Sequence, residues 1–320
     1  MLIDCHVHLV PPALLGGGEA GAWRPSVRLE GSDQLAEVAG RSARIGPRDI
    51  TSLEQAREAA RGRGCEAVVV SPWIQLAGDQ YESANDALEA SRAINDEFGR
   101  LVGTGVAALG TVPLRQPVEA VRELERALSL GLVGIEVGAS VGGVFLGDDS
   151  FAPFWAAAER LGAVVFIHPT AGGIPASAMR DHFLWNLLGN PLETAISAAH
   201  IVLSGVLDRH PALQVVLAHG GGALPALRGR LAHGWSFQPQ ARSRLGRSPE
   251  QALKGFFYDT VVYDPGVLRD LAGFAGSERL LMGSDDPFQM AESDPAGLVR
   301  AAGLDPVDLG LTAARLFGFR

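Results

Sequence analysis

The sequence predicts a (β/α)8 barrel, also called a TIM barrel, and three observations lead to this fold class. Short runs of β-branched and apolar residues alternate with longer amphipathic segments along nearly the whole chain of 320 residues. There are eight such runs, which is the number of parallel strands that closes this barrel. The turn after the first run reads HVHLVPP, so it lacks the glycine-rich turn that is typical of a doubly wound open sheet, the rival fold.

The expected strands are nearly continuous runs of Val, Ile, Leu and Ala, as is typical of strands buried on both faces. They lie at residues 1–5, 66–71, 102–107, 132–137, 163–168, 214–219, 256–260 and 280–285. Amphipathic patterns predict helices at 51–64, 84–99, 117–130, 151–161 and 190–210. The last helix is expected to begin with Asn190 as its N-cap, Pro191 at its first position and Glu193 two residues later.

Residues 1–320 are expected to form a single barrel domain, because this fold takes about 250 residues and tolerates insertions. Residues 11–50 show little periodicity, and they contain a run of three glycines and scattered arginines. We therefore expect this segment to form a long loop or a small insertion above the first strand.

The composition limits the partners and the compartment. The formal net charge is -9, and an acidic chain lacks the basic surface with which proteins bind nucleic acid. The apolar runs are far shorter than the ~18 residues that span a membrane, and the N-terminus shows no signal-peptide pattern. The two cysteines, Cys5 and Cys65, are not in a metal-binding or disulfide spacing. We expect a cytoplasmic protein that binds neither nucleic acid nor membranes.

The first expected strand runs into an alternating set of polar side chains, Asp4, His6 and His8. Because side chains alternate along a strand, all three are expected on one face, with Cys5 and Val7 on the other. Two imidazoles side by side at a strand end can bind one metal ion. Ordinary hydrogen bonding of the two histidines is the alternative, and Asp4 is expected to support the site rather than bind the metal.

Two more candidate ligands lie at the ends of other expected strands. His168 ends the fifth strand in VVFIHPT, and Asp285 ends the eighth in LLMGSDDPF. Barrel active sites form at the carboxyl ends of the strands, so both side chains are expected beside His6 and His8. A buried carboxylate is costly unless it is paired or binds a cation. Three histidines and an aspartate suit zinc, or another divalent ion such as manganese, cobalt or iron.

His219 ends the sixth expected strand and is followed by three glycines. It is either a further imidazole ligand or a general base or acid. We prefer the second interpretation, because imidazole titrates near neutral pH and the other four side chains already fill a metal site. The glycines would let backbone or substrate approach closely.

A single metal ion is favoured over two. The bridging carboxylated lysine of binuclear barrels has no counterpart, because the one lysine, Lys254, lies just before the seventh strand. Glu136 on the fourth strand is the remaining candidate for a bridge. Asp286 is the alternative to Asp285 as a ligand, and His182, in the loop after the fifth strand, is a candidate substrate contact.

The motifs DxHxH, FIHPT, LAHGGGALP and GSDDPF together resemble those of the amidohydrolase superfamily. Within it, the likeness is to aminocarboxymuconate-semialdehyde decarboxylase and related nonoxidative decarboxylases. The resemblance covers most of the chain and is densest from Val164 to Pro239. The motifs are specific for the superfamily but less so for the reaction, because the same group includes hydratases and lactonases.

The resemblance implies roles for individual residues. The zinc ligands of these decarboxylases match His6, His8, His168 and Asp285, and their catalytic histidine, which acts beside Asp285, matches His219. Three further positions are similar to substrate-binding residues: a carboxylate-binding arginine (Arg44), a pocket tryptophan (Trp185), and an arginine that reaches a neighbouring subunit's active site (Arg230). The last of these implies a homodimer.

The chain also departs from the family pattern near the expected pocket. Thr170 stands where an aromatic residue commonly follows the HP of the fifth strand, and Asp286 stands where the eighth-strand motif usually has Tyr. Residues 11–50 differ as well. These departures concern the substrate more than the chemistry.

Three functions follow from these observations. The leading hypothesis is a metal-dependent decarboxylase of a small unsaturated or aromatic carboxylic acid. The alternative is a metal-dependent hydrolase or hydratase that uses the same site on a lactone, an amide or an enol acid. The third is a non-catalytic barrel that binds a ligand. The mass of the product separates the first two, and absence of stoichiometric metal would favour the third.

Overall fold

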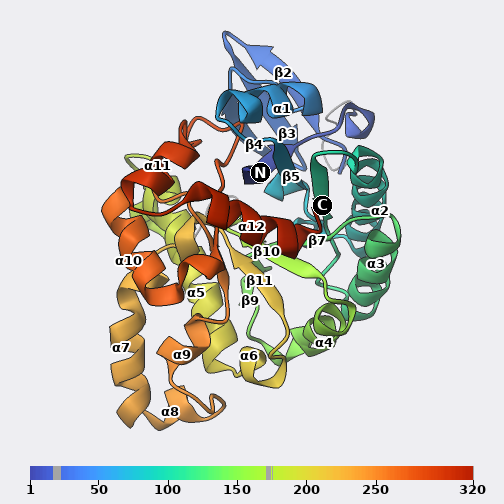
Figure 1. The fold of residues 1–320 in the computed structure, drawn as a ribbon. Coiled ribbons are helices and arrows are strands. Elements are labelled where there is room, and N and C mark those ends of the chain that lie inside the picture. The colour runs from blue at the N-terminus through green and yellow to red at the C-terminus, as the bar shows by residue number, and fades with distance from the viewer. Residues whose placement is uncertain (17–22, 171–173, 175, 320) are drawn as a thin grey trace.

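The computed structural model describes residues 1–16, 23–170, 174 and 176–319, and its centre is a sheet of eight parallel strands (Figure 1). In spatial order the strands are β1 (Ile3–Leu9), β5 (Ala67–Pro72), β6 (Val106–Gly110), β7 (Gly134–Gly138), β10 (Val164–His168), β11 (Gln214–Leu217), β12 (Phe257–Asp259) and β13 (Leu280–Leu281). Because each strand pairs with the next one along the chain, the sheet curls in one direction, as a barrel requires.

Backbone hydrogen bonds bring the first strand against the last segment of the sheet. Cys5 N donates to Met282 O over 2.8 Å, and Asp285 N donates to His6 O over 2.9 Å. His8 N then donates to Asp286 O over 2.8 Å. The predicted (β/α)8 barrel is therefore confirmed, and its closing seam runs directly beside the histidines of β1.

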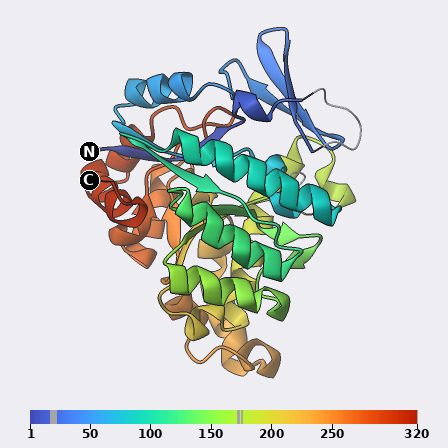
Figure 2. The same cartoon turned by 90° about the vertical axis from the view of Figure 1, so that its right-hand side faces the viewer.

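The helices lie outside the sheet, and α2, α3 and α4 lie side by side along one flank (Figure 2). They are α1 (Leu53–Gly62), α2 (Ala84–Leu101), α3 (Pro117–Ser129), α4 (Ala152–Leu161), α5 (Asn190–Leu203), α6 (Val206–Arg209), α7 (Leu224–Phe237), α8 (Pro239–Arg242), α9 (Pro249–Leu253), α10 (Pro265–Ala275), α11 (Pro295–Ala301) and α12 (Pro306–Phe317). Their buried faces carry mostly small and aliphatic residues, such as Ala90 and Ile94 of α2. No helix within the described part of the chain has the length and apolar character to cross a membrane.

Residues 11–50, which the sequence left as a loop or a small insertion, contain a three-stranded antiparallel sheet. Its strands are β2 (Ser26–Glu30), β3 (Asp33–Val38) and β4 (Arg41–Gly46), and they lie together at one end of the molecule (Figure 1). Alternate residues of β3, including Ala36 and Val38, are buried, which explains why the sheet packs on the barrel. Part of the glycine run, with the rest of residues 17–22, lies outside the described residues.

Three expected boundaries are wrong for local reasons. The third strand begins at Val106 rather than at residue 102, because Gly103 and Val106 form a turn with Gly105 at φ +72°. Asn190 does not cap α5, because a π-helix at Trp185–Gly189 runs straight into it and Asn190 itself has helical angles. The long helix expected to reach residue 210 ends at Leu203, with α6 following separately.

Asp4 does not share a face with His6 and His8, which corrects the prediction from strand alternation. The pairing of β1 with β5 shifts register between Asp4 and Val7, and such an irregularity re-aims side chains. Cys5 consequently packs in the same apolar cluster as Phe166, and the His6 ring also lies 4.9 Å from the Phe166 ring. The Asp4 carboxylate turns away from the histidines.

Asp4 and Asp286 instead share the guanidinium of Arg63, which follows α1. The Arg63 side chain is 6% exposed, and its nitrogens lie 2.9 Å from Asp4 Oδ2 and 3.2 Å from Asp286 Oδ1. Ser284 also donates its backbone N–H and its hydroxyl to Asp4. Arg63 therefore links β1 to the segment after β13, which are the two sides of the seam where the barrel closes.

Replacing Arg63 with alanine is expected to lower the free energy of unfolding by about 3–5 kcal/mol, because it leaves the buried Asp4 without a counterion and Asp286 with Arg48 alone. Chemical denaturation monitored by circular dichroism measures this change. Arg61→Ala is the matched control on α1, since Arg61 pairs with Glu54 at the surface and such pairs contribute about 0–1 kcal/mol. Equal losses in the two variants would contradict this interpretation of Arg63.

Candidate metal centre

Three histidines and an aspartate from distant parts of the chain converge at the carboxyl ends of the strands. His6 and His8 lie on β1, His168 ends β10, and Asp285 follows β13. The Nε2 atoms of His6 and His8 are 2.9 Å apart, and they lie 3.4 and 3.3 Å from Asp285 Oδ1. The His168 ring is 5.3 Å from the ring of His6 and 4.9 Å from that of His8. The structure thus brings the four predicted ligands together.

Hydrogen bonds on the far side of each ring fix which nitrogen carries the proton. His6 Nδ1 lies 2.7 Å from Asp259 Oδ2, at the end of β12. His8 Nδ1 lies 3.2 Å from the carbonyl oxygen of Pro72, and His168 Nδ1 lies 2.9 Å from that of Pro169. Because these oxygens only accept, each Nδ1 must donate, and in the neutral form of the ring, which is the form that binds a metal, each Nε2 is left with a lone pair.

The residues present fit a divalent metal ion. Two imidazole lone pairs 2.9 Å apart repel each other unless a cation lies between them. His168 Nε2 and Asp285 Oδ1 are buried and make no hydrogen bond to any described residue, which is costly without a further partner. Three nitrogen donors and one carboxylate oxygen are a donor set that zinc and other first-row ions accept.

The charges of these groups also favour a cation. Burial works against an ionised Asp285, yet the neighbouring histidines hold the pKa of this carboxyl well below its usual range. Burial disfavours a charged His8 as well, but Glu136 and Asp285 raise its pKa to about 9. Burial and the adjacent histidines lower the pKa of His168 far below its usual value. The cluster therefore keeps a carboxylate that attracts positive charge and a neutral imidazole beside it.

His219 lies next to Asp285 in this cluster. Its Nε2 is 3.4 Å from Asp285 Oδ2, and its ring is 5.2 Å from that of His168. It adopts φ +55° directly before the glycines 220–222, and Gly220 N donates to Asp259 Oδ1 over 2.8 Å. Burial lowers the pKa of His219, but the bond to Asp285 raises it above the ordinary value. The geometry is compatible with a ligand and with a proton-transferring group.

Glu136 of β7 lies beneath the histidines. Its carboxylate is buried, and neither oxygen finds a hydrogen-bond partner among the described residues. Its oxygens lie 3.8 Å from His8 Nδ1 and 4.0 Å from His168 Nδ1, on the ring edges that point away from the Nε2 cluster. Burial raises the pKa of Glu136 to about 7, against the opposing effect of His8. Asp286, the alternative to Asp285, is instead bound by Arg63 and Arg48.

A cavity of about 580 Å³ opens beside the cluster, and residues from several separate segments of the chain line it. Its lining includes the site residues His168, His219 and Asp285, the predicted residues Arg44 and Trp185, and the apolar residues Ile74, Phe183, Val261, Val262, Tyr263 and Phe288. The half-exposed Arg44 side chain pairs with Glu30 at 2.7 Å and with Asp33 at 3.4 Å, so a substrate carboxylate would compete with these two carboxylates for it.

Two other predicted substrate contacts do not line this cavity. Arg230 is exposed on α7 and is absent from the described lining of its own chain's cavity. His182 is exposed, with φ +56°, in the loop just before Phe183. The role of Arg230 across a subunit boundary therefore stays a prediction.

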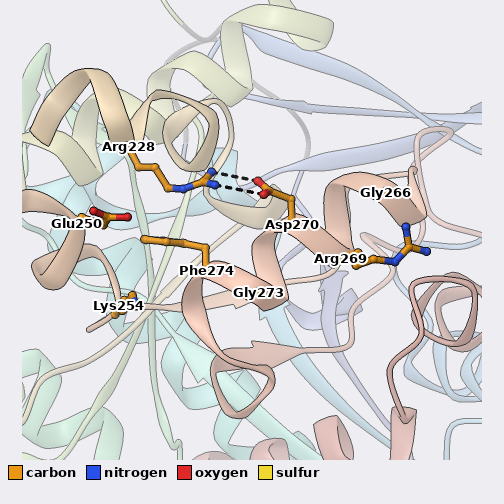
Figure 3. A pocket seen from close by; sticks show the side chains of 8 residues that line it. All are labelled: Arg228, Glu250, Lys254, Gly266, Arg269, Asp270, Gly273 and Phe274. Carbon is orange, nitrogen blue, oxygen red and sulfur yellow. Dashed lines mark hydrogen bonds and ion pairs between the residues drawn. The ribbon is translucent and has the colours of Figure 1, made fainter. Parts of the chain in front are cut away.

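A second cavity, of about 590 Å³, lies on the outer surface between α7, α9 and α10 (Figure 3). Arg228 and Asp270 form a two-pronged ion pair across it, at 3.0 and 3.1 Å, and Phe274 lies beneath Arg228. Its lining contains none of the residues of the metal cluster. It is a shallow, charged surface feature rather than part of the site.

The sequence did not reveal how Glu193 acts. It was expected only as the third helical residue after an Asn190 cap, but its buried carboxylate accepts hydrogen bonds from the backbone N–H of Thr170, at 2.8 Å, and from the Thr170 hydroxyl, at 2.7 Å. Ser140 donates to it as well. Glu193 thereby fixes the residue that stands where relatives of the expected family carry an aromatic. A glutamate beside a helix start gives no sequence signal for this role.

Comparison with known proteins shows which sequences this chain resembles. The chain is 33% identical over 226 residues to 2-amino-3-carboxymuconate-6-semialdehyde decarboxylase of Dictyostelium discoideum, an alignment that spans 69% of this chain and 63% of that protein. It is 29% identical to 6-methylsalicylic acid decarboxylase of Penicillium expansum, over 89% of this chain and 84% of that protein.

The fold is shared with 5-carboxyvanillate decarboxylase LigW from Sphingomonas paucimobilis. The TM-score is 0.82 at 24% identity, and the superposition covers 100% of this chain and 99% of that one. The family model described as Amidohydrolase matches residues 3–319. With the barrel and the histidine–aspartate cluster in place, this match means that the chain belongs to the amidohydrolase family.

Proposed function

We propose that the protein is a metal-dependent nonoxidative decarboxylase of an aromatic or unsaturated carboxylic acid. The observation that carries this proposal is the convergence of three imidazole lone pairs and the Asp285 carboxylate at the base of a largely apolar cavity. The names of the two sequence relatives support the reaction class, because both are decarboxylases. An apolar cavity of about 580 Å³ is also a suitable size for one substituted aromatic ring.

His6, His8, His168 and Asp285 would hold the metal. Zinc is the first choice for three imidazoles and a carboxylate, with manganese, cobalt or iron as alternatives. When bound, the metal would supply positive charge that attracts and orients an anionic substrate oxygen. The hydrogen bonds from His6 to Asp259 and from His8 to Pro72 would keep both rings turned toward it.

His219 would move the proton that the reaction requires. In a decarboxylation the bond between the carboxyl carbon and its neighbour breaks, and the electron pair stays on the neighbouring carbon. That carbon then takes up one proton, and CO2 leaves. His219 lines the cavity and hydrogen-bonds to Asp285, which favours its protonated form, so it is placed and poised to donate.

CO2 release by metal-loaded and by chelated protein tests this proposal. Ortho-hydroxybenzoates, ortho-aminobenzoates and aminocarboxymuconate semialdehyde are the starting substrates, and released CO2 is quantified together with the metal content of the same samples. CO2 that appears only with bound metal is expected. Equal CO2 release after complete removal of the metal would overturn the assignment.

We also propose that the protein is a homodimer in which α7 takes part. Among the described residues of this helix only Leu224 is buried, while Leu227 and Phe237 are 42% and 55% exposed. Arg230 lies on the same helix, so a partner packed there would come close to it. Sedimentation velocity tests this idea: a dimer is expected for the wild type, and Leu227→Asp with Phe237→Asp is expected to shift it to monomer. A monomeric wild type would contradict it.

A further inference from the structure

Glu193 is a buried carboxylate in the first turn of α5, and the proposed chemistry does not use it. It is 2% exposed, and three donors meet its two oxygens. The backbone N–H of Thr170 donates to Oε2 over 2.8 Å, and the hydroxyls of Thr170 and Ser140 each donate to Oε1 over 2.7 Å. An ionised carboxylate only accepts hydrogen bonds, and its burial is costly unless donors surround it. The three donors therefore suit a buried negative charge.

One of these donors belongs to the peptide unit that also holds His168. The carbonyl oxygen of Pro169 lies 2.9 Å from His168 Nδ1, and the N–H of the same peptide unit is the one that Thr170 donates to Glu193. Because a peptide unit is planar, its C=O and N–H point in opposite directions. The carboxylate, the peptide unit and the imidazole thus form one chain of hydrogen bonds, which ends at a proposed metal ligand.

The hold on the N–H is also a hold on the acceptor of His168. The chain is fixed as far as His168, whose carbonyl oxygen accepts from the backbone N–H of Ala139 over 2.8 Å. The ring of Pro169 then locks its own φ, so the freedom that remains is rotation of the whole peptide plane between Pro169 and Thr170. Such a rotation would move the N–H away from Glu193 and the carbonyl oxygen away from Nδ1 together.

The other two histidines show what the carboxylate adds. The partner of His6 Nδ1 is the carboxylate of Asp259 itself, at 2.7 Å. The partner of His8 Nδ1 is a peptide carbonyl, as at His168, but the N–H of that peptide unit donates to the neutral carbonyl oxygen of Leu9 over 3.0 Å. His168 therefore combines the relayed geometry of His8 with the charged end point of His6. A charge at the end of such a chain polarises the bonds between and makes the ring a stronger metal ligand.

We propose that Glu193 is a positioning residue that orients His168 toward the metal, and strengthens it as a ligand, through the Pro169–Thr170 peptide unit. This inference rests on the proposed function, because it takes His168 to bind the metal ion. It deepens that proposal by adding to the metal centre a residue of α5 that does not itself line the cavity.

The metal affinity of the whole protein tests the inference without requiring turnover. Competition with a chromogenic chelator gives Kd for Zn²⁺ and for Co²⁺. Glu193→Gln keeps the size of the side chain and removes its charge. Glu193→Asp keeps the charge and retracts it by one methylene, so it carries the test if Glu193→Gln does not fold. Glu159→Gln is the matched control, because Glu159 of α4 also accepts from a backbone N–H, that of Ala212, and from a histidine, His210, each over 2.9 Å.

Proton NMR of the cobalt-loaded protein supplies a second readout. Bound Co²⁺ moves the Nδ1–H signal of each coordinated histidine far outside the ordinary spectrum, and these signals disappear in D2O because the protons exchange. One of these signals is expected to shift or to exchange faster in Glu193→Gln, while the others keep their positions. A general loosening of the fold would change all of them together.

Both Glu193 variants are expected to bind Zn²⁺ and Co²⁺ about 10- to 100-fold more weakly than wild-type protein, as is typical when the partner of a metal-binding histidine is lost. Glu159→Gln is expected to lose thermal stability and to keep both Kd values within about twofold. Unchanged Kd values in the Glu193 variants, equal weakening in Glu159→Gln, or a joint change of all Nδ1–H signals would overturn the inference.

CO2 release by the same preparations separates this inference from the proposed function. Any of the three contrary results leaves the proposed function standing if metal-loaded wild-type protein releases CO2. Weaker metal binding in the Glu193 variants, with no CO2 release by metal-loaded wild-type protein, would support the role of Glu193 and contradict the proposed reaction. Wild-type protein that binds neither metal would contradict the metal centre on which both proposals rest.

Discussion

Asp285→Ala protein is expected to purify without stoichiometric metal and to release no CO2. Asp285 Oδ1 lies 3.4 Å from His6 Nε2 and 3.3 Å from His8 Nε2, so it is the carboxylate that completes the proposed ligand set. Removing it leaves three neutral imidazoles and no negative charge to balance a divalent ion. Metal content by plasma mass spectrometry and CO2 release from the best substrate measure the two effects.

Asp286→Asn is the matched control for this experiment. It changes the adjacent carboxylate, which Arg63 and Arg48 bind on the side away from the histidines. The control is expected to lose some stability and to keep its metal. A metal-replete, fully active Asp285→Ala protein would contradict the proposed centre, and loss of metal in both variants would show that the change acts through the fold.

His219→Ala protein is expected to keep its metal and to lose about a hundred- to ten-thousandfold in kcat, as is typical when a general acid or base is removed. The residue lines the cavity and contacts Asp285 through a single 3.4 Å hydrogen bond. Turnover under saturating substrate and metal content are measured on the same sample. The control is His200→Ala, which changes an exposed histidine on α5 that does not line the cavity and is expected to leave both unchanged.

The metal measurement decides between the two interpretations of His219. Its Nε2 lies close enough to His6, His168 and Asp285 to join them in holding one ion. If His219→Ala loses its metal together with its activity, the histidine is a ligand, and the proton must come from another group. Retained metal with lost turnover supports the role proposed here.

The barrel and the meeting of the four proposed ligands follow from local sequence patterns. Eight apolar runs predicted the eight strands. The carboxyl ends of parallel strands lie at one rim of the barrel, however many residues separate the strands in the sequence. His168 and Asp285 were therefore placed correctly although 117 positions separate them. The register shift in β1, which turns Asp4 toward Arg63, depends on how β1 pairs with β5 and leaves no trace in the alternation of residues.

The substrate-binding wall was much harder to predict. Arg44 has the right residue type, but its pairing with Glu30 and Asp33 arises from the antiparallel sheet of the insertion, which the sequence pattern did not resolve. Such features depend on contacts between segments far apart in the chain, whereas motifs report what lies within a few residues.

Mass analysis of the product formed by metal-loaded protein tests the central claim most directly. The hydroxybenzoate panel is incubated with loaded and with chelated protein, in ordinary and in deuterated water, and every product is weighed. We predict a product that has lost CO2 and carries one hydrogen from solvent at the carbon that bore the carboxylate. We also predict that it forms only with bound metal. A product heavier by one water with the carboxylate intact would contradict decarboxylation and assign the same metal centre to a hydrolase or hydratase.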